Sequence, residues 1–83
     1  MVFKQLLVEF EKELKKIALT TIQENQDNFA VGMLALNAMG NFRQRLENKL
    51  LGMKDELGRS EREISDGIEE IYTKVYEELF ETP

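Results

Sequence analysis

Residues 28–42 read NFAVGMLALNAMGNF, and no charged residue falls between Asp27 and Arg43. If this stretch is helical, its apolar side chains lie on every side of the helix axis instead of forming one stripe. A helix that is apolar all round is usually buried all round. A chain of 83 residues has little other protein with which to cover it. The stretch therefore predicts that a second copy of the chain, or a partner, completes the cover.

The composition is typical of one soluble helical domain covering residues 1–83. Hydrophobic residues make up 42% of the chain and charged residues 33%, which excludes an intrinsically disordered class. The single proline is Pro83, and helix-favouring residues dominate. The chain has no cysteine and no histidine, so disulfides are excluded. A domain this small then depends on tight helix packing and on oligomerisation.

Apolar residues recur at spacings of three and four, which predicts helices at about 2–23, 28–57 and 60–81. Short connections favour antiparallel neighbours. The predicted fold is all-α, a small bundle of three antiparallel helices completed by self-association. The core-facing residues are predicted to be Phe3, Leu7, Phe10, Leu14 and Ile17, then Ala35, Met39, Phe42, Leu46, Leu50, Met53 and Leu57, and finally Ile64, Ile68, Ile71, Val75 and Leu79.

Capping signals set the predicted boundaries. Asp27 or Asn28 is expected to cap the second helix, because its side-chain oxygen accepts from free backbone N–H groups. Gly58 is expected to end that helix in a left-handed conformation. The sequence Ser60-Glu-Arg-Glu63 matches a capping box for the third helix. Gly52 is a weak point in an otherwise continuous second helix.

The candidate self-association surface combines small and large apolar residues of the second helix. Glycine in a helix is costly unless close packing uses it. One interpretation is that neighbouring helices of the same chain cross tightly over these glycines. The other is contact with a second copy of the chain. The residues assigned to self-association are Phe29, Gly32, Met33, Leu36 and Gly40.

A polar stripe on the second helix is a candidate ligand face. Amide and guanidinium groups on one helix face can hold a small anion, such as a nucleotide, through charge-assisted hydrogen bonds. The competing interpretation is a solvated face or a network of amide hydrogen bonds between helices. The candidate residues are Asn41, Arg45, Asn48 and Lys49.

The third helix carries an aromatic edge and the excess acidic charge. Tyr72, Tyr76 and Phe80 are either the edge of the core or a docking edge for a partner. Residues 59–83 hold three basic and eight acidic side chains, and this difference equals the net charge of −5 of the whole chain. Such a helix disfavours contact with nucleic acid. It is either a solvated face or a decoy that docks on a basic partner.

Catalysis, cofactors and membranes have little support in the residues. Without histidine or cysteine, and with no glycine-rich phosphate loop, no catalytic, cofactor-binding or metal-binding residues are assigned, and the chain is not expected to be an enzyme. Glu9 and the acidic residues after it interrupt the apolar N-terminus, which argues against a signal peptide. Residues 28–42 are too short to span a bilayer, so a cytoplasmic location is expected.

These observations favour a non-enzymatic assembly or regulatory module that acts through self-association and protein contacts. The alternatives are an oligomeric protein that captures a small anionic ligand, and an acidic inhibitor of a basic partner protein.

Overall fold

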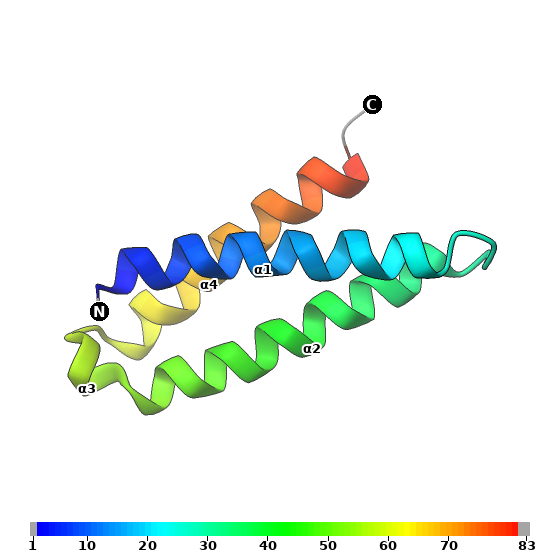
Figure 1. The fold of residues 1–83 in the computed structure, drawn as a ribbon. Helices are drawn as coiled ribbons and strands as arrows, with labels where there is room; N and C mark the ends of the chain where they lie inside the picture. Colours follow the sequence, from blue (N-terminus) through cyan, green and yellow to red (C-terminus); the bar gives the residue numbers. More distant parts are fainter. Residues whose placement is uncertain (1, 82–83) are drawn as a thin grey trace.

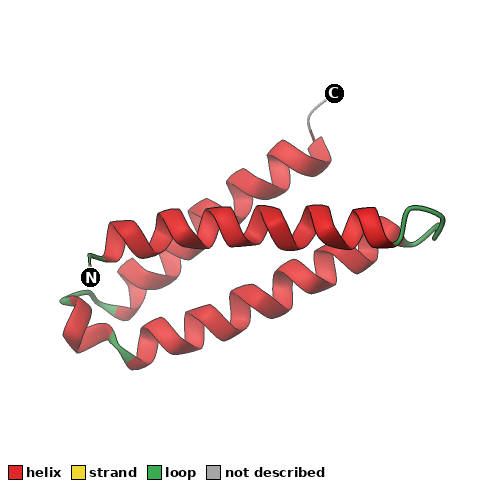
Figure 2. Ribbon diagram, in the orientation of Figure 1, coloured by secondary structure: helices red, strands yellow, loops and turns green. Residues whose placement is uncertain are grey.

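Three long helices and two short helical segments make up residues 2–81, the part of the chain that the computed structural model describes (Figure 1). The described residues contain no strand, so the all-α class is confirmed (Figure 2). The elements are α1 (Phe3–Glu24), α2 (Val31–Gly52), α3 (Lys54–Leu57), α4 (Glu61–Tyr76) and the π-helical turn η1 (Glu77–Glu81).

Consecutive long helices run in opposite directions, so α1 and α4 run broadly the same way, with α4 crossing behind α1 in this view (Figure 1). Each of the three contacts the other two. The molecule measures 45 × 23 × 19 Å, with a radius of gyration of 13.8 Å. A compact chain of this length would have a radius of gyration of about 12 Å. The bundle is therefore elongated and its core is thin.

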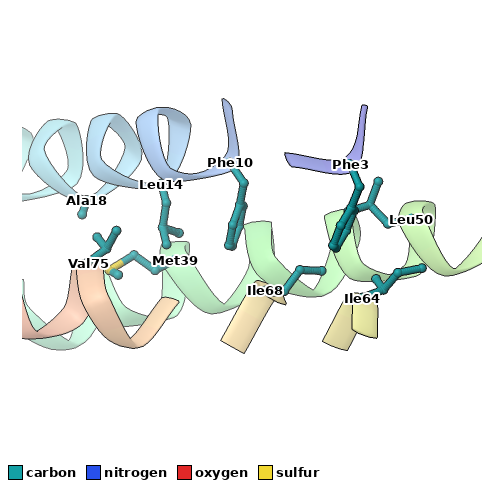
Figure 3. Close-up of a cluster of buried hydrophobic side chains, with 9 residues drawn as sticks. All are labelled: Phe3, Phe10, Leu14, Ala18, Met39, Leu50, Ile64, Ile68 and Val75. Atoms are coloured by element: carbon teal, nitrogen blue, oxygen red, sulfur yellow. The ribbon is translucent and has the colours of Figure 1, made fainter. Parts of the chain in front are cut away.

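The core runs along the seams that the apolar spacing predicts. Phe10, Leu14, Met39, Ile64 and Ile68 are almost completely buried between the three long helices (Figure 3). The Phe10 ring stacks on that of Phe42, with centroids 5.8 Å apart. Burial of one such side chain contributes about 1.5–3 kcal/mol. These contacts orient α1, α2 and α4, and thereby set the outward faces on which any site lies.

The connection between α3 and α4 confirms both of its predicted capping signals. Gly58 has a φ of 67°, the left-handed conformation expected after a helix. The Ser60 Oγ accepts from the Glu63 backbone N–H at 3.1 Å. In return, the Ser60 backbone N–H donates to the Glu63 carboxylate at 3.2 Å. This reciprocal pair fixes the start of α4.

The predicted start of the second helix at residue 28 is wrong by three residues. The side-chain oxygen of Asn28 accepts from the Ala30 backbone N–H at 2.8 Å, and its carbonyl accepts from Val31. Asn28 therefore closes a turn on itself, a local alternative to helix that asparagine side chains offer. α2 begins only at Val31, with no side-chain cap at Ala30.

The predicted continuous helix to residue 57 is also wrong, because the chain breaks at Met53. The Met53 N–H donates to the Leu50 carbonyl, three residues back, and its ψ of 12° leaves the helical range. Gly52 precedes this break and supplies no side chain to hold the helix together. The break lets α3 turn toward the bundle, where Leu57 packs against the core.

The last predicted helix changes geometry before its end. α4 gives way at Glu77 to the π-helical turn η1. A π-turn rotates the chain less per residue than an α-turn, because its hydrogen bonds span five residues. Leu79 and Phe80, both in this turn, pack against the core.

Candidate functional site

Two large apolar residues of the uncharged stretch are exposed at one end of the bundle. Phe29 sits in the connection between α1 and α2, and its side chain is fully exposed (103%). Met33, in the first turn of α2, is 68% exposed. A large apolar side chain that is fully exposed leaves its hydrophobic free energy unrealised in the monomer. We call Phe29, Gly32, Met33 and Gly40 the loop–α2 surface.

The two glycines of this surface have no close neighbour within the chain. A Cβ built on Gly32 or on Gly40 would meet no atom within 4 Å. The interpretation that these glycines permit a tight crossing of helices of the same chain is therefore wrong. Leu36, which the sequence assigns to the same surface, is half-buried and packs against the core. The structure thus separates Leu36 from the outward-facing Phe29 and Met33.

The close helix approach occurs at Gly67 of α4 instead. A Cβ at Gly67 would lie 3.1 Å from the Leu7 Cδ1 atom and 3.2 Å from the Phe3 Cζ atom, both on α1. Sequence reasoning assigned no contact to Gly67. Its position gives a usable signal, because it lies three residues after Ile64 and four before Ile71 and so borders the core seam.

The candidate ligand face is exposed along α2 and divided between two open grooves. Asn41 and Arg45 line a groove of about 620 Å³ together with Ile17, Ala38 and Gln44. Arg45 and Lys49 line a second groove of about 380 Å³ beside Phe42 and Leu46. Asn48 lines neither groove and accepts a 3.3 Å hydrogen bond from Gln44. The structure thus brings Arg45 next to both Asn41 and Lys49, but it does not gather all four residues in one groove.

The aromatic edge lies beside the core. Tyr72 and Phe80 pack against the core, and the Arg43 guanidinium lies 4.8 Å from the Tyr72 ring centroid. Arg43 also forms an ion pair with Glu69. The rings of Tyr76 and Phe80 are 5.5 Å apart. These contacts favour the edge-of-core interpretation of this stripe over the docking edge.

Ion pairs join α1 to α4 along their shared border. The Lys74 Nζ donates to the Glu11 carboxylate at 3.3 Å, and the Lys15 Nζ lies 2.9 Å from Glu78 and 3.1 Å from Glu11. Hydrogen bonding from Lys15, with a further contribution from Lys74, lowers the pKa of Glu11. Hydrogen bonding to Glu78 and then to Glu11 raises the pKa of Lys15. This network, which sequence reasoning did not identify, fixes the relative register of α1 and α4.

The capping box has its own electrostatic signature. The Ser60 backbone N–H, followed by the Arg59 guanidinium, lowers the pKa of Glu63.

Within residues 2–81 no group of three or more acidic side chains is arranged to hold a metal ion. In the same part of the chain, no helix is long and apolar enough to cross a membrane.

Comparison with known proteins adds no functional information. No protein-family model, no curated protein and no solved structure matches the chain.

Proposed function

We propose that this protein is a non-enzymatic assembly module that associates with itself through the loop–α2 surface. The observation that carries the proposal is the full exposure of Phe29, which belongs to the same uncharged stretch as the first half of α2. Met33, four residues further along the chain, is 68% exposed, and Gly32 and Gly40 leave open space for an approaching backbone. Exposed apolar clusters of this kind are typical of protein–protein contacts.

The total surface of the molecule is consistent with this proposal. The protein exposes 5822 Å² of accessible surface. An average folded monomer of this mass exposes roughly 5,100 Å². The excess is similar to the roughly 800 Å² that each partner buries in an interface of standard size. The elongated bundle can therefore bury this additional surface in an interface while its buried core stays unchanged.

Solution mass measurements on matched variants test the proposal. Phe29→Ser combined with Met33→Glu removes the two exposed apolar side chains and adds one charge. Because both side chains are exposed, the fold should persist, with the free energy of unfolding of the isolated chain changed by about 0.5 kcal/mol or less. At about 0.5 M NaCl, which screens contacts between charged groups, sedimentation should show a dimer or larger species for the wild type at micromolar concentration and a monomer for the double variant.

The matched control is Asn48→Glu, which adds the same charge to the exposed face of α2, away from the loop–α2 surface. This control should sediment like the wild type. A wild type that stays monomeric throughout the micromolar range would refute self-association. A double variant that remains dimeric at this high salt concentration would refute the assignment to this surface.

Capture of a small anion is the second candidate function, and the groove shared by Asn41 and Arg45 is the observation that favours it. A screen of nucleotides and organic phosphates by thermal shift tests it. Under this hypothesis Arg45→Ala removes hydrogen bonds to a charged group worth about 1.5–3 kcal/mol, so the ligand would bind roughly tenfold more weakly or worse. If no compound raises the wild-type melting temperature, the hypothesis is rejected.

A further inference from the structure

The outward side of α1 carries all of that helix's lysines. At 3.6 residues per turn, Lys4, Lys12, Lys15 and Lys16 fall within about one third of the helix circumference. Val8 and Leu19 lie between them and are 48% and 52% exposed. The glutamates of α1 lie outside this arc. We call the six residues the basic strip: Lys4, Val8, Lys12, Lys15, Lys16 and Leu19.

The outward side of α4 and η1 carries an acidic counterpart. Asp66, Glu70 and Glu77 are exposed and, by the same helical rotation, fall on one narrow face. We call these three residues the acidic strip. Within residues 2–81, Glu70 of this strip and both Lys4 and Lys16 of the basic strip have no ion-pair partner. The charges are therefore only partly satisfied inside the chain.

The two strips run side by side on the face of the molecule that points away from α2. The sides of α1 and α4 that meet α2 are marked by Phe10 and Tyr72, which contact Phe42 and Arg43 respectively. Helical rotation places the strips away from these sides. The ion pairs Glu11–Lys74 and Lys15–Glu78 both join residue i to residue i+63, so α1 and α4 run in the same direction with a fixed offset along their shared border, although α4 crosses behind α1 at an angle (Figure 1). Lys4 therefore lies at the level of residue 67, between Asp66 and Glu70.

A face with parallel basic and acidic strips is complementary to itself. We propose that a second copy of the chain docks on this face about a two-fold axis parallel to α1. That rotation lays the basic strip of each copy on the acidic strip of the other and preserves the level of every residue, so that Lys4 meets Asp66 and Glu70. It also covers Val8. A two-fold interface of this kind presents the same patch from both subunits.

This contact differs from the loop–α2 surface, because it uses the opposite side of the bundle and depends on charge. It extends the proposed self-association, since two separate interfaces on one chain allow assemblies larger than a dimer. The net charge of −5 repels two copies at a distance. Docking thus depends on the opposed strips, whose charges meet at distances well below the Debye length of about 10 Å at 0.1 M salt.

The test uses charge reversal and is performed in the background of Phe29→Ser with Met33→Glu. Because this background removes the loop–α2 surface, the measured association reports only on the face with the two strips. Variant one adds Lys4→Glu and Lys12→Glu, and variant two adds Asp66→Lys and Glu70→Lys. The background protein should form a dimer at low salt. Its dissociation constant should rise about tenfold or more between roughly 0.05 and roughly 0.5 M NaCl. Each reversed variant should be monomeric alone, because like charges then oppose each other in both halves of the interface.

Mixing the two reversed variants is the decisive step. In the mixed pair, both halves of the interface again join opposite charges, so an equimolar mixture should restore the dimer. The matched control is Arg45→Glu with Lys49→Glu, which makes the same charge change on α2 and should leave the background dimer intact. A background protein that is monomeric at low salt, or a mixture that stays monomeric, would overturn the proposal.

A further variant keeps the test valid if a double reversal unfolds the chain, as judged by circular dichroism. Val8→Glu places one acidic group in the middle of the basic strip at an exposed position. It should abolish the low-salt dimer of the background protein, and an unchanged dimer would contradict the proposal. Failure of the loop–α2 surface leaves these results unaffected, because that surface is already removed in the background.

Discussion

Gly67 is the residue at which α4 approaches α1 most closely, and it contrasts with Gly40. A Cβ at Gly67 would press on Leu7 and Phe3, whereas a Cβ at Gly40 would meet no atom within 4 Å. Both residues are glycines inside a helix, Gly40 in the uncharged stretch and Gly67 among acidic residues. The sequence alone predicts that each weakens its helix, but only the packing separates their roles.

Leucine at these two positions should have opposite effects on the isolated fold. Gly67→Leu forces α1 and α4 apart and should lower the free energy of unfolding by about 1–3 kcal/mol. Gly40→Leu replaces glycine by a better helix former in open space and should raise it by up to about 1 kcal/mol. Chemical denaturation at low protein concentration measures both. A Gly67→Leu variant as stable as the wild type would contradict the close approach described here.

Leu14 tests the core at the same scale. Its side chain is completely buried between the three long helices. Leu14→Ala should cost about 2–5 kcal/mol, which is the usual range for such a truncation. This is a large share of the stability of a domain whose total is about 4–12 kcal/mol. Leu19→Ala is the matched control because Leu19 is exposed on the same helix, and its effect at low protein concentration should stay near 0.5 kcal/mol.

At the scale of elements, periodicity predicts the helices well and predicts their interruptions poorly. The buried residues of α1, α2 and α4 follow the expected spacings, and Gly58 and Ser60 mark a boundary because their capping chemistry is local. The late start of α2 and the break at Met53 depend on competing local hydrogen bonds and on where the core ends. The sequence does not show whether Asn28 starts the helix or forms a turn before it. It also does not show whether the helix continues or breaks after Gly52.

The same division applies to the candidate sites. The lack of charge between Asp27 and Arg43 draws attention to α2. It does not separate the exposed Phe29 from the half-buried Leu36, because this requires the positions of the loop and of α1. The ion pairs between α1 and α4 join residues 63 positions apart, so no local pattern reveals them.

These ion pairs predict an acid-sensitive link between α1 and α4. Because Lys15 and Lys74 lower the pKa of Glu11 from its ordinary 4.5, the folded state binds this proton less readily than the unfolded state. The stabilisation is fully present above pH 4.5 and is lost as the pH falls below it, through the lowered pKa. The difference in melting temperature between wild type and Glu11→Gln should therefore be positive at neutral pH and shrink toward zero in acid.

Glu9→Gln is the matched control for this pH series. Glu9 is exposed on the same helix, and its contact with Lys12 is long at 3.9 Å. Thermal melts of the three proteins across the acid range measure the effect. A Glu11→Gln difference that persists unchanged at the lowest pH would contradict the assignment to this ion pair.

At the scale of the whole molecule, both the elongated shape and the exposed surface favour association between copies of the chain. An elongated bundle with a thin core has a small margin of stability and a large exposed area. Two outward faces, one apolar at the α1–α2 end and one with paired charges along α1 and α4, are left without cover in the single chain. Association through either face would add stability, because binding to the folded state alone favours folding.

The concentration dependence of the melting temperature tests the central claim of self-association through the loop–α2 surface most directly. For a dimer of this size that unfolds to separate chains, a tenfold rise in concentration should raise the melting temperature by about 2–4 °C. At high salt, where the charged strips are screened, the wild type and Asn48→Glu should show this rise, and Phe29→Ser with Met33→Glu should not. A wild-type melting temperature that is the same from low to high micromolar concentration would contradict the account.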